Sequence, residues 1–132
     1  MREIKFRGKD VETGEWRYGS LIIEGNTPYI MCGKLYFLDD NSGKFAGIYQ
    51  VDPKTVGQYT EFKTKNGTEV YEYDIVKFRS EDVEGIGVIK YNPPQFKILA
   101  EFFLGGKAEI LEVIGNVFDN PELIAGGKDE GD

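Results

Sequence analysis

Carboxylates are the chain's main candidates for chemistry, because it contains no histidine and only one cysteine. Without histidine, the commonest general base and metal ligand are missing, and Ser–His or Cys–His nucleophiles cannot form within one chain. Two acidic pairs remain, Asp39 with Asp40 and Glu72 with Asp74. Paired carboxylates can hold a cation or perform acid–base catalysis, which makes a carboxylate-based hydrolase one hypothesis. Such pairs are also typical of solvated loops and turns, and we expect that arrangement, with no catalytic residue, metal or cofactor.

Four tyrosines are the predicted binding residues: Tyr59, Tyr71, Tyr73 and Tyr91. Small β domains often use exposed aromatic side chains to grip extended peptides, because a ring offers apolar area beside a polar hydroxyl. The alternative is that the four rings pack at the rim of the fold with their hydroxyls in water. The sequence leaves both arrangements open, and a binding role requires the exposed patch.

Composition favours strands over helices. The chain has 132 residues, 14% of them aromatic, and 17 glycines. Large flat side chains suit a pleated, half-buried sheet, whereas long helices tolerate glycine poorly. This length is usual for one domain, so we expect a single domain over residues 1–124 and a disordered acidic tail over residues 125–132. The predicted fold class is all-β or β-dominated.

The first half reads as antiparallel strands separated by turn residues. Residues 16–24 form one predicted strand, and residues 29–32 and 35–38 form two more around Gly33. Asp52 followed by Pro53 is a helix-start pattern, since Asp caps free N–H groups and Pro suits the first helical position. A glycine follows soon afterwards, so we expect only a single helical turn there.

The second half is cleaner β sequence. Residues 75–78, 86–91 and 110–118 are predicted strands, the last bulged at Gly115. A second short helical turn is expected after Asn120. Turn signals spaced roughly ten residues apart are typical of a barrel or sandwich. We therefore predict a small SH3-like barrel over about residues 68–118, with the N-terminal strands packed against it.

Charge is distributed unevenly along the chain. Residues 1–60 carry 8 basic and 8 acidic side chains, whereas residues 61–132 carry 8 basic and 15 acidic ones, which accounts for the net charge of −7. Direct nucleic-acid binding is not expected, because such proteins normally show a basic face. The fold could still gather five N-terminal cations on one side, namely Arg2, Lys5, Arg7, Lys9 and Arg17.

The lone cysteine, Cys32, lies in an apolar stretch and is expected to be a buried core residue. One cysteine and no secretory signal fit a reducing cytosol, so we expect a cytoplasmic protein. No apolar run approaches the roughly 20 residues of a membrane-spanning helix, and no membrane association is expected.

Two long motifs lie in the middle of the chain, at residues 51–60 (VDPKTVGQYT) and 65–77 (KNGTEVYEYDIVK). Together with the opening IKFRG of residues 4–8 and the closing VIGNVFDNPEL of residues 113–123, they resemble the YopX family of phage and prophage proteins. The family usually has glycine where Glu61 and Tyr73 stand. The resemblance implies a phage or prophage origin, a β-rich fold and an intracellular setting, and it supplies no catalytic residue.

Three functional hypotheses follow from these observations. The leading one is a non-enzymatic protein-interaction module, made during phage growth or lysogeny, that binds an unknown host or phage protein. The runner-up is an acidic mimic or inhibitor that occupies the nucleic-acid site of a basic host protein. The third is the carboxylate-based hydrolase. Exposed strand edges also make a homo-oligomer an open alternative.

Overall fold

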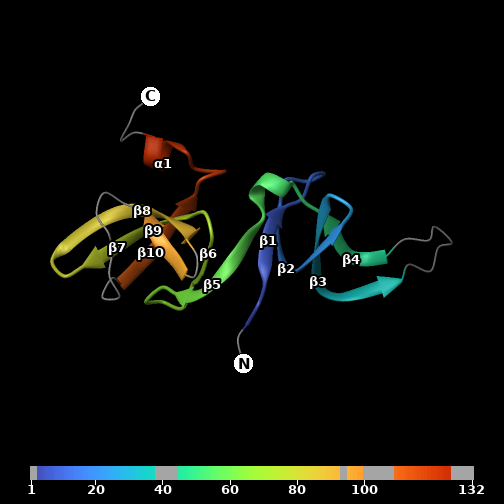
Figure 1. Cartoon of the computed structure of the whole chain (residues 1–132), viewed down its shortest axis with the longest axis horizontal. Coiled ribbons are helices and arrows are strands. Elements are labelled where there is room, and N and C mark those ends of the chain that lie inside the picture. The colour runs from blue at the N-terminus through green and yellow to red at the C-terminus, as the bar shows by residue number, and fades with distance from the viewer. Residues whose placement is uncertain (1–2, 38–44, 93–94, 100–108, 126–132) are drawn as a thin grey trace. The chain divides into compact units, whose positions relative to one another are not determined.

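The structure, a computed structural model, describes residues 3–37, 45–92, 95–99 and 109–125. It is dominated by antiparallel strands (Figure 1), which confirms the predicted all-β class. In chain order the elements are β1 (Phe6–Lys9), β2 (Trp16–Glu24), β3 (Thr27–Phe37), β4 (Phe45–Gln50), the 3-10 turn η1 (Pro53–Thr55), β5 (Gly57–Lys63), β6 (Glu69–Tyr71), β7 (Asp74–Ser80), β8 (Val83–Asn92), β9 (Gln95–Leu99), β10 (Glu109–Asn116) and α1 (Glu122–Ala125).

The chain divides into two compact units, Met1–Tyr59 and Thr60–Asp132. Each unit has its own strands and buried residues, and they are described separately below. The prediction of one domain over residues 1–124 stays a prediction. The acidic tail lies, from residue 126 onwards, outside the described residues.

In the N-terminal unit the strands lie in the order β4-β3-β2-β1-β5. The predicted strand over residues 16–24 is confirmed as β2. The two strands predicted around Gly33 are wrong, because β3 runs unbroken from Thr27 to Phe37. Gly33 has a φ of +69°, and the β3–β4 register shifts between Met31 and Tyr36. The glycine therefore belongs to an irregularity within one strand, not to a turn between two.

The C-terminal unit contains a four-stranded sheet in the order β10-β7-β8-β9. Val70, Val76 and Ile89 form its buried cluster, against which Ile110 and Val113 pack. As predicted, β10 is irregular near Gly115, where its register with β7 shifts. The described strands do not close into a barrel, since this sheet ends at β10 on one side and β9 on the other. The SH3-like arrangement of about residues 68–118 stays a prediction.

Tight turns occur where the sequence places residues that tolerate positive φ. The β5–β6 connection closes with a hydrogen bond from Gly67 N to Thr64 O of 2.9 Å, and Gly67 has a φ of +89°. The acidic loop between β7 and β8 is short, because Ser80 already pairs with Val83. Beyond β10, α1 is the short helical turn predicted after Asn120.

Candidate functional site

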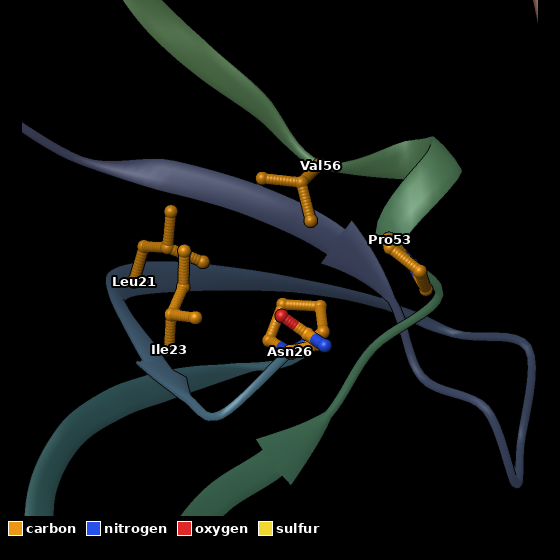
Figure 2. Close-up of a pocket in the computed structure, with 6 residues that line it drawn as sticks. Leu21, Ile23, Asn26, Pro53 and Val56 are labelled. Carbon is orange, nitrogen blue, oxygen red and sulfur yellow. The ribbon is translucent and has the colours of Figure 1, made fainter.

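An open apolar hollow of about 340 Å³ lies in the N-terminal unit (Figure 2). Strand β2 contributes Leu21 and Ile23, which alternate along the strand and therefore share one face. Asn26, from the β2–β3 turn, is the one polar residue of the lining. The other lining residues come from β3 and from the segment around η1, and they are Pro28, Pro53 and Val56. A hollow lined in this way suits an apolar side chain whose polar neighbours stay in water.

The wall formed by η1 is tied to β1 by a set of short hydrogen bonds. Asp52 caps η1 as predicted, since its carboxylate accepts from the backbone N–H of Lys54 at 3.0 Å. The Thr55 hydroxyl donates to the carbonyl of Asp52 at 2.7 Å and accepts the Lys9 N–H at 2.9 Å. The Asp52 N–H in turn donates to the carbonyl of Lys9 at 2.8 Å. These bonds fix the segment that carries Pro53, which is part of the hollow's wall.

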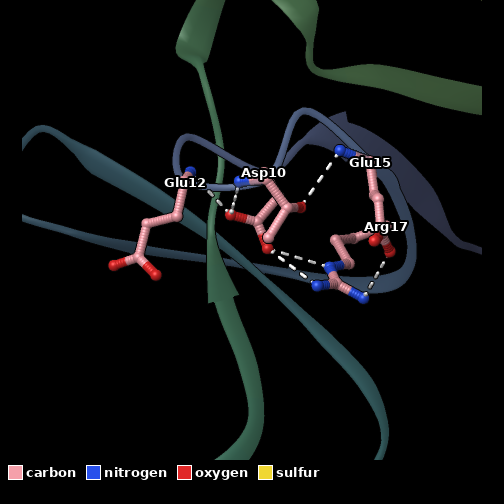
Figure 3. Close-up of polar contacts among 5 residues, drawn as sticks. Asp10, Glu12, Glu15 and Arg17 are labelled. Carbon is pink, nitrogen blue, oxygen red and sulfur yellow. Dashed lines mark hydrogen bonds and ion pairs between the residues drawn. The ribbon is translucent and has the colours of Figure 1, made fainter.

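Asp10 organises the turn between β1 and β2 (Figure 3). Its carboxylate accepts two hydrogen bonds from Arg17, from Nε at 3.0 Å and Nη2 at 2.9 Å, and further bonds from the N–H groups of Glu12 and Thr13. The hydrogen bond from the Glu12 N–H, assisted by Arg17, lowers the pKa of Asp10 despite its burial. The Arg17 guanidinium also lies 3.9 Å from the centre of the Tyr49 ring. The network therefore anchors the hairpin.

Three N-terminal cations lie on one face of β1, where residues two apart point the same way. Lys5 lies over the Tyr59 ring at 5.1 Å, while Arg7 and Lys9 lie over the Trp16 ring at 4.7 and 5.8 Å. Arg17 does not join them, because its strand partner is Gly8, which faces the other way. Arg2 lies outside the described residues.

An exposed patch that includes all four tyrosines is not formed, because two of them are buried. Tyr59 and Tyr71 are each only 3% exposed. The Tyr59 N–H donates to the Lys5 carbonyl at 2.8 Å, and the Lys5 ammonium group lies over the Tyr59 ring. Tyr73 is half-buried and Tyr91 is 50% exposed. A binding role for Tyr73 and Tyr91 stays a prediction.

The acidic pairs are placed differently from one another. Asp74 is buried, and its carboxylate accepts the N–H of Tyr71 at 2.8 Å, which gives it a structural role at the β6–β7 turn. Glu72 is half-buried, whereas Asp39 and Asp40 lie outside the described residues. In the part of the chain that the structure covers, no group of three or more potential ligands is placed to hold a metal ion. Cys32 is half-buried, not fully buried as predicted.

Side chains of the closing motif, residues 113–123, accept hydrogen bonds from backbone N–H groups at the turn after β10. The Asn116 side-chain oxygen accepts the N–H groups of Phe118 and Asp119 at 3.0 and 2.9 Å. The Asn120 side chain accepts the Asn116 N–H at 3.2 Å and fills the space beside Gly115, where a Cβ would lie 2.6 Å from it. These residues shape the turn after β10.

Sequence reasoning missed the hollow and the Asp10 network. The alternation of Leu21 and Ile23 indicated that they share a face, but nothing in the sequence indicated that Pro53 and Val56 lie beside them. The spacing of Asp10 and Arg17 on either side of a turn was a usable signal, because facing strands bring such residues together.

Taken together, these features define an antiparallel β protein whose motif residues stabilise turns and whose N-terminal unit carries an open apolar hollow. A family model described as YopX protein matches residues 5–125, so the chain belongs to the YopX protein family. This confirms the resemblance seen in the sequence motifs. No curated protein matches the chain. Within the described residues, no helix has the length and apolar character needed to cross a membrane.

Proposed function

We propose that the chain is a non-enzymatic protein-interaction module that binds a host or phage protein in the cytoplasm. The observation that supports this most is the hollow between β2 and η1, which is apolar, open and built on a braced backbone. The residues of the family motifs described above serve capping and packing, which leaves the exposed apolar surface as the feature available for function.

Ile23 is the central side chain of this proposal. It is 63% exposed although it is fully apolar, and Leu21 and Val56 line the same hollow. Covering such a cluster removes apolar area from water and leaves Asn26 to orient the ligand by hydrogen bonding. An apolar side chain from a partner protein, with its backbone running over the rim, fits both properties.

Affinity capture from phage-carrying host cells, followed by mass spectrometry, tests the proposal. The wild-type chain is compared with Ile23→Asp, which places a charge in the hollow, and with the matched control Ile86→Asp. Ile86 is 51% exposed and lies on β8 in the C-terminal unit. We expect a partner that the wild type and Ile86→Asp retain and that Ile23→Asp loses. Failure to enrich any partner would contradict the proposed function, and a partner kept by Ile23→Asp would contradict the hollow as its site.

The second candidate is an acidic mimic that occupies a basic groove of a host protein. It is favoured by the charge of residues 61–132, whose 15 acidic and 8 basic side chains give a net −7. Attraction between such a surface and a basic groove weakens as salt screens it. Affinity for the captured partner should then fall steeply between low and high salt, whereas salt-independent binding favours the apolar hollow.

Two further alternatives have less support. A carboxylate-based hydrolase that uses Glu72 with Asp74 has less support because the buried Asp74 carboxylate already accepts the Tyr71 N–H. The other pair, Asp39 and Asp40, lies outside the described residues. Self-association through a strand edge is open to β4, β6, β9 and β10, which end their sheets among the described strands. Light scattering on the purified chain distinguishes a monomer from an oligomer. A chain that stays monomeric at all concentrations would contradict self-association.

A further inference from the structure

Tyr73 occupies a backbone conformation that bulky residues avoid. It lies in the two-residue turn between β6 and β7 and has a φ of +76°. Its N–H donates to the Ile89 carbonyl at 2.8 Å, and its own carbonyl accepts the Val117 N–H at 3.0 Å. These two bonds hold the residue in place from β8 and from the turn after β10. A bulky side chain at a strained position of this kind, where the family usually has glycine, suggests that the side chain has a use in this chain.

The Tyr73 ring forms one half of an aromatic corner. The ring of Phe118 lies 5.4 Å away, centre to centre, with an angle of 72° between the two planes. Both rings are half-buried, so part of the corner faces solvent. Burial, together with the charge of Glu72 and a hydrogen bond to it, raises the pKa of the Tyr73 hydroxyl. The corner therefore combines two nearly perpendicular rings with a carboxylate.

The segments beside this corner are predominantly acidic, although β7 and β8 also contain Lys77 and Lys90, the latter next to Ile89. Residues 66–76 and 109–125 contain seven carboxylates and neither lysine nor arginine. One of the seven, Asp74, is used internally by the Tyr71 N–H, and Asp119 accepts from the Asn116 side chain. In the N-terminal unit, Arg7 lies over the Trp16 ring, which shows the same kind of cation–ring pairing within this chain. Electrostatics at the corner thus favour a cation from outside.

We infer that Tyr73, Phe118 and Glu72 form a docking site for an arginine or lysine side chain of a partner protein. Aromatic faces attract a guanidinium or ammonium group within about 6 Å of the ring centre, and the attraction grows when the group is partly desolvated. The carboxylate of Glu72 adds a charge-assisted hydrogen bond to the same group. This site lies in the C-terminal unit, whereas the hollow lies in the N-terminal unit. An experiment can therefore contradict one of the two proposed binding sites without contradicting the other.

The test uses short capped peptides with a central arginine, lysine or glutamine between glycines. Binding is followed by NMR, as shifts of tyrosine and phenylalanine ring signals in the full chain during titration. We expect saturable shifts of the Tyr73 and Phe118 rings with the arginine and lysine peptides, and none with the glutamine peptide. No saturable shift with either basic peptide, or equal shifts with the neutral one, overturns the proposal.

Substitutions distinguish the contribution of the two aromatic rings to peptide affinity from a general attraction between acidic side chains and a basic peptide. Tyr73→Gly removes the ring and suits the positive φ, so the fold is preserved while affinity falls about fivefold. Phe118→Leu keeps an apolar side chain but removes the second ring, and it tests the corner independently should Tyr73→Gly fold poorly. Glu72→Gln should weaken binding about threefold, against less than about twofold for the control Glu81→Gln at the β7–β8 turn. Unchanged affinity in both ring variants would show that only bulk charge attracts the peptide, and it would overturn the site.

Discussion

Gly8 of β1 lies directly against the side chain of Val51. A Cβ atom on Gly8 would lie 2.8 Å from both Cβ and Cγ2 of Val51, which is fully buried. A β-branched side chain in a packed core has little freedom to move aside. Gly8, from the IKFRG opening, and Val51, which begins the motif of residues 51–60, are therefore complementary in shape.

Replacing Gly8 with alanine should destabilise the N-terminal unit by about 1–3 kcal/mol, because the added methyl group overpacks the core. Val51→Ala opens space at the same contact, so the double variant Gly8→Ala/Val51→Ala should lose less stability than the sum of the single variants. Urea denaturation of the four proteins measures this coupling. Additive losses would show that the two side chains do not compete for space.

Acid should weaken the N-terminal unit through Asp10. Hydrogen bonding, first from the Glu12 N–H and then from Arg17, lowers the pKa of Asp10 below its ordinary value of 3.8. A carboxyl group with a lowered folded-state pKa contributes stability that is present above its unfolded pKa and lost as the pH falls through the folded one. The unfolding free energy should therefore decline below about pH 4.

Asp10→Asn identifies the carboxylate as the source of that decline. The variant should lose about 2 kcal/mol at neutral pH, because the Arg17 guanidinium loses the charge of the buried Asp10 carboxylate and keeps that of the exposed Glu15, 3.5 Å away. Its stability should then depend less on pH between 2 and 5 than that of the wild type. Denaturation midpoints measured across this range check both effects, and parallel pH profiles for the two proteins would contradict the assignment.

Thr55 should be essential for the position of η1. Its hydroxyl bonds both the Lys9 N–H and the Asp52 carbonyl, and the residue is buried. Thr55→Val keeps the shape but leaves the Lys9 N–H without this acceptor, which should cost about 1–3 kcal/mol. Thr55→Ser keeps the hydroxyl and should cost less. A larger loss for Thr55→Ser than for Thr55→Val in thermal or urea denaturation would assign the role of Thr55 to its methyl group instead.

Sequence patterns correctly predicted the elements that depend on interactions between residues close together in the chain. Strand β2 and the cap of η1 were predictable, because alternation and an Asp–Pro pair act within a few residues. Gly33 was misread, since a glycine with positive φ marks an irregular strand as readily as a turn. The sequence has no local signal that separates these two cases.

Features that depend on pairing between distant strands were not predictable. Tyr59 is buried only because β5 pairs with β1, which sets its ring under Lys5. The hollow likewise needs Pro53 beside Ile23, and the Thr55–Lys9 bond that braces the Pro53 segment spans 46 residues. A single sequence contains the residues for such sites but not the contacts that assemble them.

Glu61 connects the sequence motif to the backbone. Family resemblance places glycine at this position, and the residue has a φ of +74°, as Tyr73 has at the second such position. A side chain in this region is strained, whereas glycine is not. Glu61→Gly and Glu61→Ala both remove the carboxylate, so they differ only in the backbone and the methyl group. We expect Glu61→Gly to be more stable than Glu61→Ala by about 1 kcal/mol in urea denaturation. Equal stability of the two variants, or a more stable alanine, would mean that residue 61 adopts a negative φ in solution and that β5 is regular there.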